Sequence, residues 1–170
     1  MRLVRPLLIV VALATLAACS GFQVPEQPSF YRDIAQGGQL DGEAAASMIS
    51  GYRKNNGLAE VTLDADLSRM AQAQAESMAK RDKLDRAAGK PFVVRLKASG
   101  YDAKRAAENI GAGYHTLAEA FSGWRDSPPH NANMLLKGAT RIGIAAVYTP
   151  ASKYKVYWAL ILAEPDDKKR

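Results

Sequence analysis

The sequence predicts an α+β domain, because amphipathic helical segments come first and two strand-like segments close the chain. The strand-like runs, Arg141–Tyr148 and residues 154–162, are rich in β-branched and aromatic residues and flank a polar loop. This pattern is typical of an antiparallel hairpin. The helical segments carry apolar residues three and four positions apart and start at capping residues. With 170 residues and no internal repeat, we expect one domain.

Several helices are expected before the hairpin, and most have a local reason to begin where they do. Asp41 and Asp64 are suited to cap the first two, while Thr116 and Glu119 form a capping box that gives Glu119 a structural role. Trp124 is expected in the core, as are the methionines at helical spacing. The expected helices are 41–56, 64–83, 91–99 and 116–126, followed by a helical turn at 130–136.

The N-terminus has the features of a bacterial lipoprotein signal. Arg2 and Arg5 form a basic start, and the apolar run at 7–16 is too short to span a bilayer comfortably. Leu-Ala-Ala then precedes Cys19, which is the only cysteine of the chain. Lipid attachment explains both its position and its solitude, whereas a free thiol or an intermolecular disulfide are the alternatives. We therefore expect a signal peptide at 1–18, an acylated, palmitate-bearing Cys19 and a flexible tether at 19–41.

The expected lipid anchor has consequences for location. Ser20 stands where an Asp would favour the inner membrane of a Gram-negative cell, so the outer membrane, facing the periplasm, is expected if the source is Gram-negative. Within the tether, Phe22, Phe30 and Tyr31 are expected either to pack on the domain or to enter the membrane interface. The folded domain is expected at 42–165, as a monomer, with a charged tail at 166–170.

The positive charge is concentrated in one segment. The chain has 23 basic and 17 acidic residues, a net charge of +6. From Lys80 to Arg105 there are nine basic residues but only three acidic ones. This segment is either a solvated surface or a patch for anionic lipid or polysaccharide. Nucleic acid is excluded as a partner, because the chain carries an export signal and the segment lacks the interleaved aromatics of a single-strand binder.

Two motifs in the second half of the chain carry a family resemblance. Glu108-Asn109-Ile110 is followed by a glycine, and a second pattern comprises Trp124, Ser127, Pro128, His130, Asn133 and Leu135. Together with the two strand-like runs, they stand in the order typical of the CAP superfamily, whose SCP domain occurs in cysteine-rich secretory proteins, antigen 5 and plant pathogenesis-related proteins. The sequence resembles this family from about residue 42 to residue 165. The resemblance implies an α-β-α sandwich with a small antiparallel sheet between helices.

The resemblance also implies a cavity in which two His and two acidic residues hold a divalent cation. In this chain Arg86 stands at the first His position and Ser127 at the second acid position, so that only Glu108 and His130 remain as ligands. Asn109 is expected to shape the same cavity. No resident metal or cofactor is expected, and divalent cations should bind weakly at most. We expect the Arg86 guanidinium to pair with the Glu108 carboxylate in place of the ion; alternatively, Arg86 turns into solvent and Asp85 faces the cavity.

Catalysis is the less favoured interpretation. Ser127, His130 and Glu108 supply the residue types of a hydrolytic triad, but a triad is defined by geometry, and no nucleophile elbow is present. The sequence therefore indicates a lipid-anchored envelope protein that binds a lipid or glycan without catalysis. Two alternatives stay open: a metal-dependent hydrolase acting on envelope peptide or glycan, and a scaffold that contacts another envelope protein through the basic segment.

Overall fold

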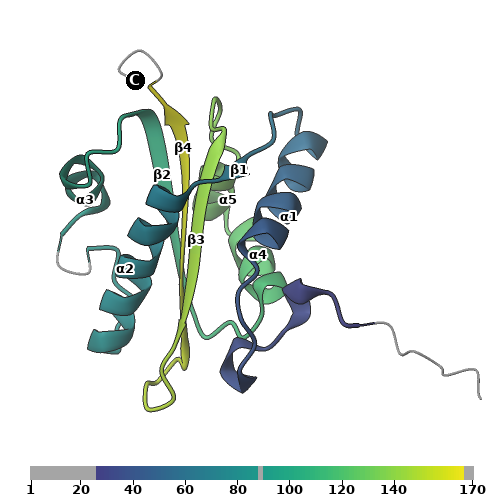
Figure 1. Ribbon diagram of the computed structural model, residues 1–170, viewed down its shortest axis with the longest axis vertical. Coiled ribbons are helices and arrows are strands. Elements are labelled where there is room, and N and C mark those ends of the chain that lie inside the picture. The colour runs from purple at the N-terminus through teal and green to yellow at the C-terminus, as the bar shows by residue number, and fades with distance from the viewer. Residues whose placement is uncertain (1–25, 88–89, 167–170) are drawn as a thin grey trace, which may run out of the picture.

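A four-stranded sheet lies between two layers of helices in the computed structural model of the chain, which describes residues 26–87 and 90–166 (Figure 1). One face carries α2 (Ala65–Arg81) and α3 (Phe92–Ala98). The other carries α1 (Gly42–Asn55), α4 (Leu117–Arg125) and α5 (Pro128–Met134). The α+β class and the sandwich architecture are confirmed. The predicted signal peptide, the lipidated Cys19 and most of the charged tail lie outside the described residues.

The strands of the sheet are β1 (Thr62–Leu63), β2 (Ala103–Ala112), β3 (Arg141–Tyr148) and β4 (Val156–Pro165). Their order in the sheet is β1-β3-β4-β2, and β3 and β4 form the predicted hairpin. The strand β4 is buried on both faces, which explains the nearly continuous apolar run in its sequence. The sheet was expected to be antiparallel, but the short strand β1 pairs in parallel with β3.

The edge strand β2 was not expected from the sequence, whose two predicted strands are those of the C-terminal hairpin. In the structure Glu108 lies within β2, opposite Ile161 of β4. The strand reads Ala-Lys-Arg-Ala-Ala-Glu-Asn-Ile-Gly-Ala, and most of these residues have little intrinsic preference for β structure. It forms because antiparallel pairing with β4 satisfies its backbone, a long-range effect that local propensity does not contain.

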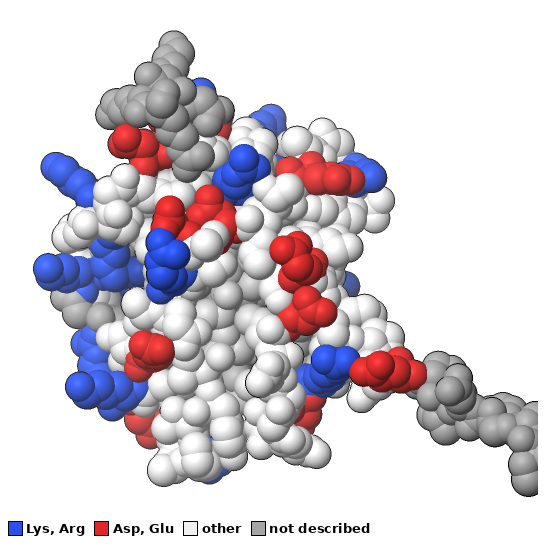
Figure 2. Space-filling model, viewed as in Figure 1, with Lys and Arg blue, Asp and Glu red and all other residues white. Residues whose placement is uncertain are grey.

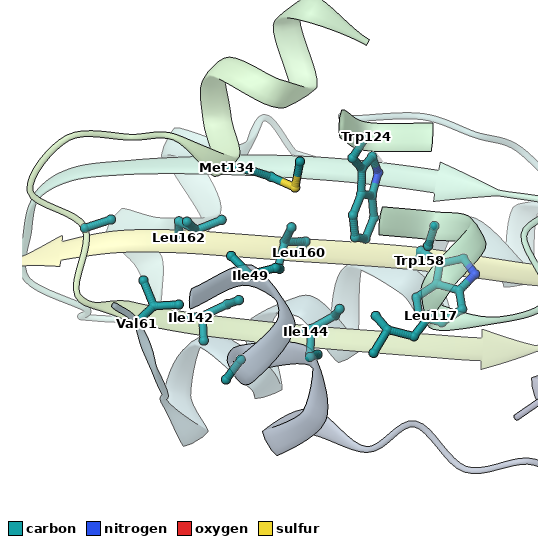
Figure 3. Close-up of a cluster of buried hydrophobic side chains, with 14 of the residues drawn as sticks. Ile49, Val61, Leu117, Trp124, Met134, Ile142, Ile144, Trp158, Leu160 and Leu162 are labelled. Atoms are coloured by element: carbon teal, nitrogen blue, oxygen red, sulfur yellow. The ribbon is translucent and has the colours of Figure 1, made fainter. Parts of the chain in front are cut away.

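The two faces of the sheet have different cores. Towards α1, α4 and α5, large side chains interdigitate, among them Trp124, Met134, Trp158 and Leu160 (Figure 3). Towards α2, small residues dominate both partners, with Ala71 and Ala75 of the helix above Ala145 and Ala159 of the sheet. The alanine-rich side lets the α2 backbone approach the strands closely. On the other side, large aromatic and aliphatic side chains fill the space between the helices and the sheet. Trp124 is therefore a core residue, as predicted.

The predicted helix caps are confirmed. The Asp41 carboxylate accepts a hydrogen bond from the backbone of Ala44, and Asp64 accepts from two backbone N–H groups of the first turn of α2. Thr116 and Glu119 form the complete capping box. The short helix α5 differs from the prediction, because it begins at Pro128 and not at His130. Proline fits the first turn of a helix, where its missing N–H would have no helical partner.

Part of the segment expected to be a flexible tether packs on the domain. Two 3₁₀ turns form here: η1 (Ser29–Tyr31) contacts α1 and α4, and η2 (Ile34–Gln36) contacts β3. Ile34 is buried and its N–H donates to the carbonyl of His115 at 2.9 Å. Phe30 packs against the core while Tyr31 is exposed; Phe22 lies outside the described residues. From Ser29 onward, the expectation of a flexible tether is therefore corrected.

Within residues 26–87 and 90–166, no helix is both long and apolar enough to cross a bilayer.

Candidate functional site: a cavity at the edge of the sheet

The candidate site lies along the outer edge of β2, beside the segment that joins α2 to α3. A cavity of about 270 Å³ opens there, lined by Arg86, Ala87, Pro91, Phe92 and Glu108. Alternate side chains of β2 point to opposite faces of the sheet. Glu108 therefore faces the α2 and α3 layer, while Asn109 faces the layer that contains α5.

The Glu108 carboxylate is held by Arg95 of α3, a residue that the sequence analysis did not single out. The Arg95 Nη2 atom lies 2.8 Å from both carboxylate oxygens. The side chains are 3% exposed for Glu108 and 18% exposed for Arg95, so the pair is largely removed from water. Burial raises the pKa of Glu108, and the hydrogen bond and charge of Arg95, with a smaller contribution from the charge of Arg86, oppose that rise.

Arg86 lines the cavity but does not make the predicted contact. Its Nη1 atom donates to the backbone carbonyl of Glu108 at 3.0 Å, and its Nη2 atom lies 2.7 Å from Nε2 of His130. The carboxylate is paired with Arg95 instead, so the expected Arg86–Glu108 ion pair is wrong in its partner. The alternative is not found either, since the carboxylate of Asp85 accepts a hydrogen bond from the backbone of Ala87.

The contact with Arg86 fixes the protonation of His130. A guanidinium has only donors, so Nε2 of the imidazole must accept and the ring proton must lie on Nδ1. Nδ1 is 3.0 Å from Oγ of Ser127 and therefore donates to that hydroxyl. Burial and the positive charge of Arg86 both lower the pKa of His130, which favours this neutral form.

Two asparagines attach α5 to the edge strand. Asn109 is fully buried and donates to the carbonyl of His130 at 2.9 Å. Asn133 donates to the side-chain oxygen of Asn109 at 2.9 Å and to the carbonyl of Glu108 at 3.2 Å. The indole N–H of Trp124 donates to the carbonyl of Ile110, two residues further along β2. These contacts satisfy backbone groups that an edge strand would otherwise present to other chains.

The site does not fit the metal centre that the resemblance implies. The carboxylate of Glu108 and Nε2 of His130 are both engaged by arginines. In the part of the chain that the structure describes, no three His, Cys, Asp or Glu side chains are grouped to hold an ion. A zinc site needs three or four such ligands, and two guanidinium groups repel a cation.

The site does not form a hydrolytic triad either. In a triad the acid orients the histidine, and the histidine accepts the proton of the serine hydroxyl. Here the carboxylate of Glu108 bonds to Arg95, and the imidazole of His130 donates to Ser127. The three residues are near one another, but each is linked in the wrong direction for nucleophilic catalysis.

Replacing Arg95 by Gln should cost stability chiefly at neutral pH. The raised pKa of Glu108 means that the folded state binds a proton more tightly than the unfolded state, whose carboxyl has its ordinary value of 4.5. Stability from this group is therefore present below that value and is lost as pH rises through the folded-state pKa. Without Arg95 the pKa of Glu108 rises further, so the variant should lose about 2–3 kcal/mol of its free energy of unfolding at pH 7.

Urea unfolding at pH 4 and pH 7 measures this difference. Lys97→Gln is the matched control, because Lys97 lies on the same helix but is exposed. An equal loss for Arg95→Gln at both pH values would contradict the assigned ion pair.

Comparison with known proteins places the chain in a family. The chain matches the family model described as "CAP: Cysteine-rich secretory protein family" over residues 46–162. It is 33% identical over 103 residues to the uncharacterized protein YkwD of Bacillus subtilis, and the match covers 59% of this chain and 40% of that protein. The chain thus spans about two fifths of the length of this curated relative.

Solved structures agree on the fold. An outer surface protein of Borrelia burgdorferi matches with a TM-score of 0.65 at 16% identity, covering 75% of this chain and 98% of that chain. An extracellular SCP-domain protein of Bacillus anthracis matches with a TM-score of 0.62 at 18% identity, covering 72% and 39% respectively. At these identities the likeness concerns the fold alone. Because the family model covers most of the sequence, the chain belongs to the cysteine-rich secretory protein (CAP) family.

Proposed function

We propose that this chain is a lipid-anchored CAP domain of the bacterial envelope that binds a ligand without catalysis. The observation that carries the proposal is the engagement of both functional groups of the cavity by arginines. Glu108 is held by Arg95, and the basic nitrogen of His130 is held by Arg86. A general base must be free to accept a proton from its substrate, and neither group is free.

The cavity is better suited to binding than to reaction. Ala87, Pro91 and Phe92 supply an apolar wall, while Arg86 adds a guanidinium with N–H groups beyond the two in its described contacts. An amphipathic ligand, such as an envelope lipid with a polar head, would find complementary chemistry on both sides. The metal-dependent hydrolase would require Arg86 and Arg95 to release His130 and Glu108 first.

Zinc titration separates these two functions. We expect the mature protein to bind Zn²⁺ no more than weakly in calorimetry. Arg86→His alone leaves Glu108 in its ion pair, so we expect tight binding only in the double variant Arg86→His/Arg95→Gln, which combines the introduced imidazole with Glu108 and His130. Arg86→Gln/Arg95→Gln removes the same charges without adding a ligand and serves as the control. Tight binding by the native protein that His130→Ala abolishes would overturn the non-catalytic proposal in favour of the hydrolase.

The envelope location is proposed from two supports. Cys19 follows a signal-like segment in the sequence, and two relatives are described as an extracellular protein and an outer surface protein. If Cys19 is lipidated, the native protein should fractionate with membranes and require detergent for extraction. After a wash at about 1 M salt, which screens charge contacts with the membrane, Cys19→Ser should appear in the soluble fraction, because it lacks the acyl chains that hold a protein by about 0.8 kcal/mol per buried CH₂ group. The same fractionation for both proteins after this wash would rule out a lipid anchor at this residue.

A further inference from the structure

Part of the basic segment forms no ion pair with the residues that the structure describes. Four of its nine cations are used inside the domain: Arg86 contacts His130, Arg95 pairs with Glu108, and Lys104 and Arg105 lie beside Glu164. The other five are exposed, and none forms an ion pair with another described residue: Lys80, Arg81, Lys83, Lys90 and Lys97. Lys and Arg side chains gather along one side of the molecule, over α3 and the end of α2 (left in Figure 2).

Exposed aliphatic side chains lie in the same stretch of chain. Val93 is 73% exposed, Val94 46% and Leu84 44%, and they make up three of the five large hydrophobic residues exposed in the described chain. We call the surface formed by these three residues and the five unpaired cations the α3 face. The two valines lie on α3 itself, and Leu84 lies in the segment that leads to it.

The fold does not account for these valines. The inner side of α3 is formed by Phe92, which packs against the α2 core, and Arg95, which holds Glu108. Val93 and Val94 contribute little to that packing, given their exposure. Valine is also a poorer helix former than alanine or leucine because its branched side chain loses rotamer freedom.

Two of the three acidic residues of this stretch accept hydrogen bonds within the domain. Asp82 accepts from the hydroxyl of Tyr157 at 2.5 Å and from the backbone N–H of Lys153 at 2.9 Å. Asp85 accepts from the backbone N–H of Ala87. The α3 face therefore combines cations with aliphatic side chains and includes no carboxylate.

We propose that the α3 face docks on the surface of an anionic phospholipid bilayer. Lysine and arginine side chains are attracted to anionic headgroups, and aliphatic side chains among them can enter the boundary of the acyl region. A glycan would be recognised by aromatic faces and hydrogen-bonding amides, which the eight residues of the α3 face do not include. The proposal goes beyond the cavity function and rests on different residues.

Docking would bring the cavity close to the membrane. Phe92 and Pro91 line the cavity from the start of α3, while Val93 and Val94 lie on its exposed side. The cavity and the proposed membrane contact therefore lie on different sides of the same helix.

Vesicle sedimentation tests the proposal. The protein used is the mature chain with Cys19→Ser, a substitution that removes any contribution of an acyl anchor. We expect it to bind vesicles of phosphatidylglycerol and phosphatidylcholine, but not pure phosphatidylcholine. Raising the salt from about 0.1 M to about 1 M shortens the Debye length from about 10 Å to about 3 Å and should release it.

Matched variants locate the contact. Lys90→Glu/Lys97→Glu should weaken binding roughly 20-fold or more, since each cation near the surface contributes roughly fivefold. Val93→Ser/Val94→Ser should weaken it about fivefold through lost insertion of aliphatic groups. Lys137→Glu and Tyr148→Ser, which change exposed residues outside the α3 face, should leave binding unchanged. Far-UV circular dichroism confirms that each variant is folded.

Three results would overturn the proposal: equal binding to neutral vesicles, equal effects of the control variants, or binding of dextran sulfate with no binding of vesicles. The last would favour an anionic polymer as the partner. None of them bears on the zinc titration or on membrane fractionation, so this inference and the proposed function can fail separately.

Discussion

Arg53→Met should lower the free energy of unfolding by about 3–5 kcal/mol or prevent folding altogether. Arg53 lies on α1 and is fully buried, yet it donates only to backbone carbonyls. Its Nε atom bonds to Ala59 at 2.9 Å, Nη1 to Met134 at 2.8 Å and Leu136 at 3.0 Å, and Nη2 to Ala139 at 2.8 Å. The variant would leave these buried acceptors without donors.

The position of these carbonyls explains why an arginine is needed. Met134 is the last residue of α5, and Leu136 and Ala139 follow in the turn that leads to β3. Carbonyls at a helix C-terminus lack helical partners and carry partial negative charge, which a cation offsets. Because α5 contributes His130 and Asn133 to the site, loss of Arg53 should also loosen the cavity.

Chemical denaturation with two comparison variants tests this role. Arg53→Lys keeps the charge but has a single nitrogen, so it should recover only part of the stability. Lys54→Met, next along the helix and exposed, removes a surface ion pair with Glu60 and should cost no more than about 1 kcal/mol. A loss for Arg53→Met as small as that for Lys54→Met would contradict the assigned role.

Gly143→Ala should be the second most damaging change, at about 3 kcal/mol. Gly143 lies on β3, directly under the start of α2. A Cβ atom there would overlap the backbone of Leu67 and Ser68, well inside van der Waals contact. Backbone atoms of a packed helix cannot turn aside as a side chain can, so the whole helix would have to lift from the sheet.

The alanine-rich interface makes such a shift costly. α2 packs through Ala71 and Ala75 on Ala145 and Ala159, with all four nearly or fully buried. Moving the helix outward would open gaps along this contact, which side chains as short as alanine cannot refill. The end of α2 also leads to Arg86, so the cavity would be displaced with it.

Gly51→Ala is the matched control for thermal and urea unfolding. Gly51 lies on α1, is exposed, and has open space where its Cβ would stand. Alanine there should stabilise the protein by about 0.5–1 kcal/mol, because glycine is the poorer helix former. Similar effects of the two glycine substitutions would show that the close packing of α2 on β3 is not what Gly143 provides.

The cavity was only partly accessible to sequence reasoning. The family resemblance selected Glu108, His130 and Arg86, and the structure brings these three together at the edge of β2. Arg95 was missed, although its spacing from Phe92 places it on the inner face of α3. Nothing local indicates that this face meets Glu108, since the contact depends on how the connecting segment folds back onto the edge strand.

The protonation of the site was likewise beyond the sequence. That Arg86 would displace a metal followed from its permanent charge. Only the structure shows that Arg86 bonds to the imidazole of His130 and that Ser127 is the acceptor on the other side of the ring. The evidence is the distance of 2.7 Å from Nη2 of Arg86 to Nε2 of His130 and of 3.0 Å from Nδ1 to Oγ of Ser127.

The sequence by itself determined the helices, their caps, the C-terminal hairpin and the family, because periodicity, capping and strand propensity are local interactions between residues a few positions apart. Only the tertiary structure decided that β2 is a strand, that Arg95 neutralises Glu108, and that Arg53 holds the end of α5. The first depends on pairing with β4, and the other two on side chains that meet across 13 and 81 positions of the chain. Such contacts are set by how the layers pack, which no local pattern encodes.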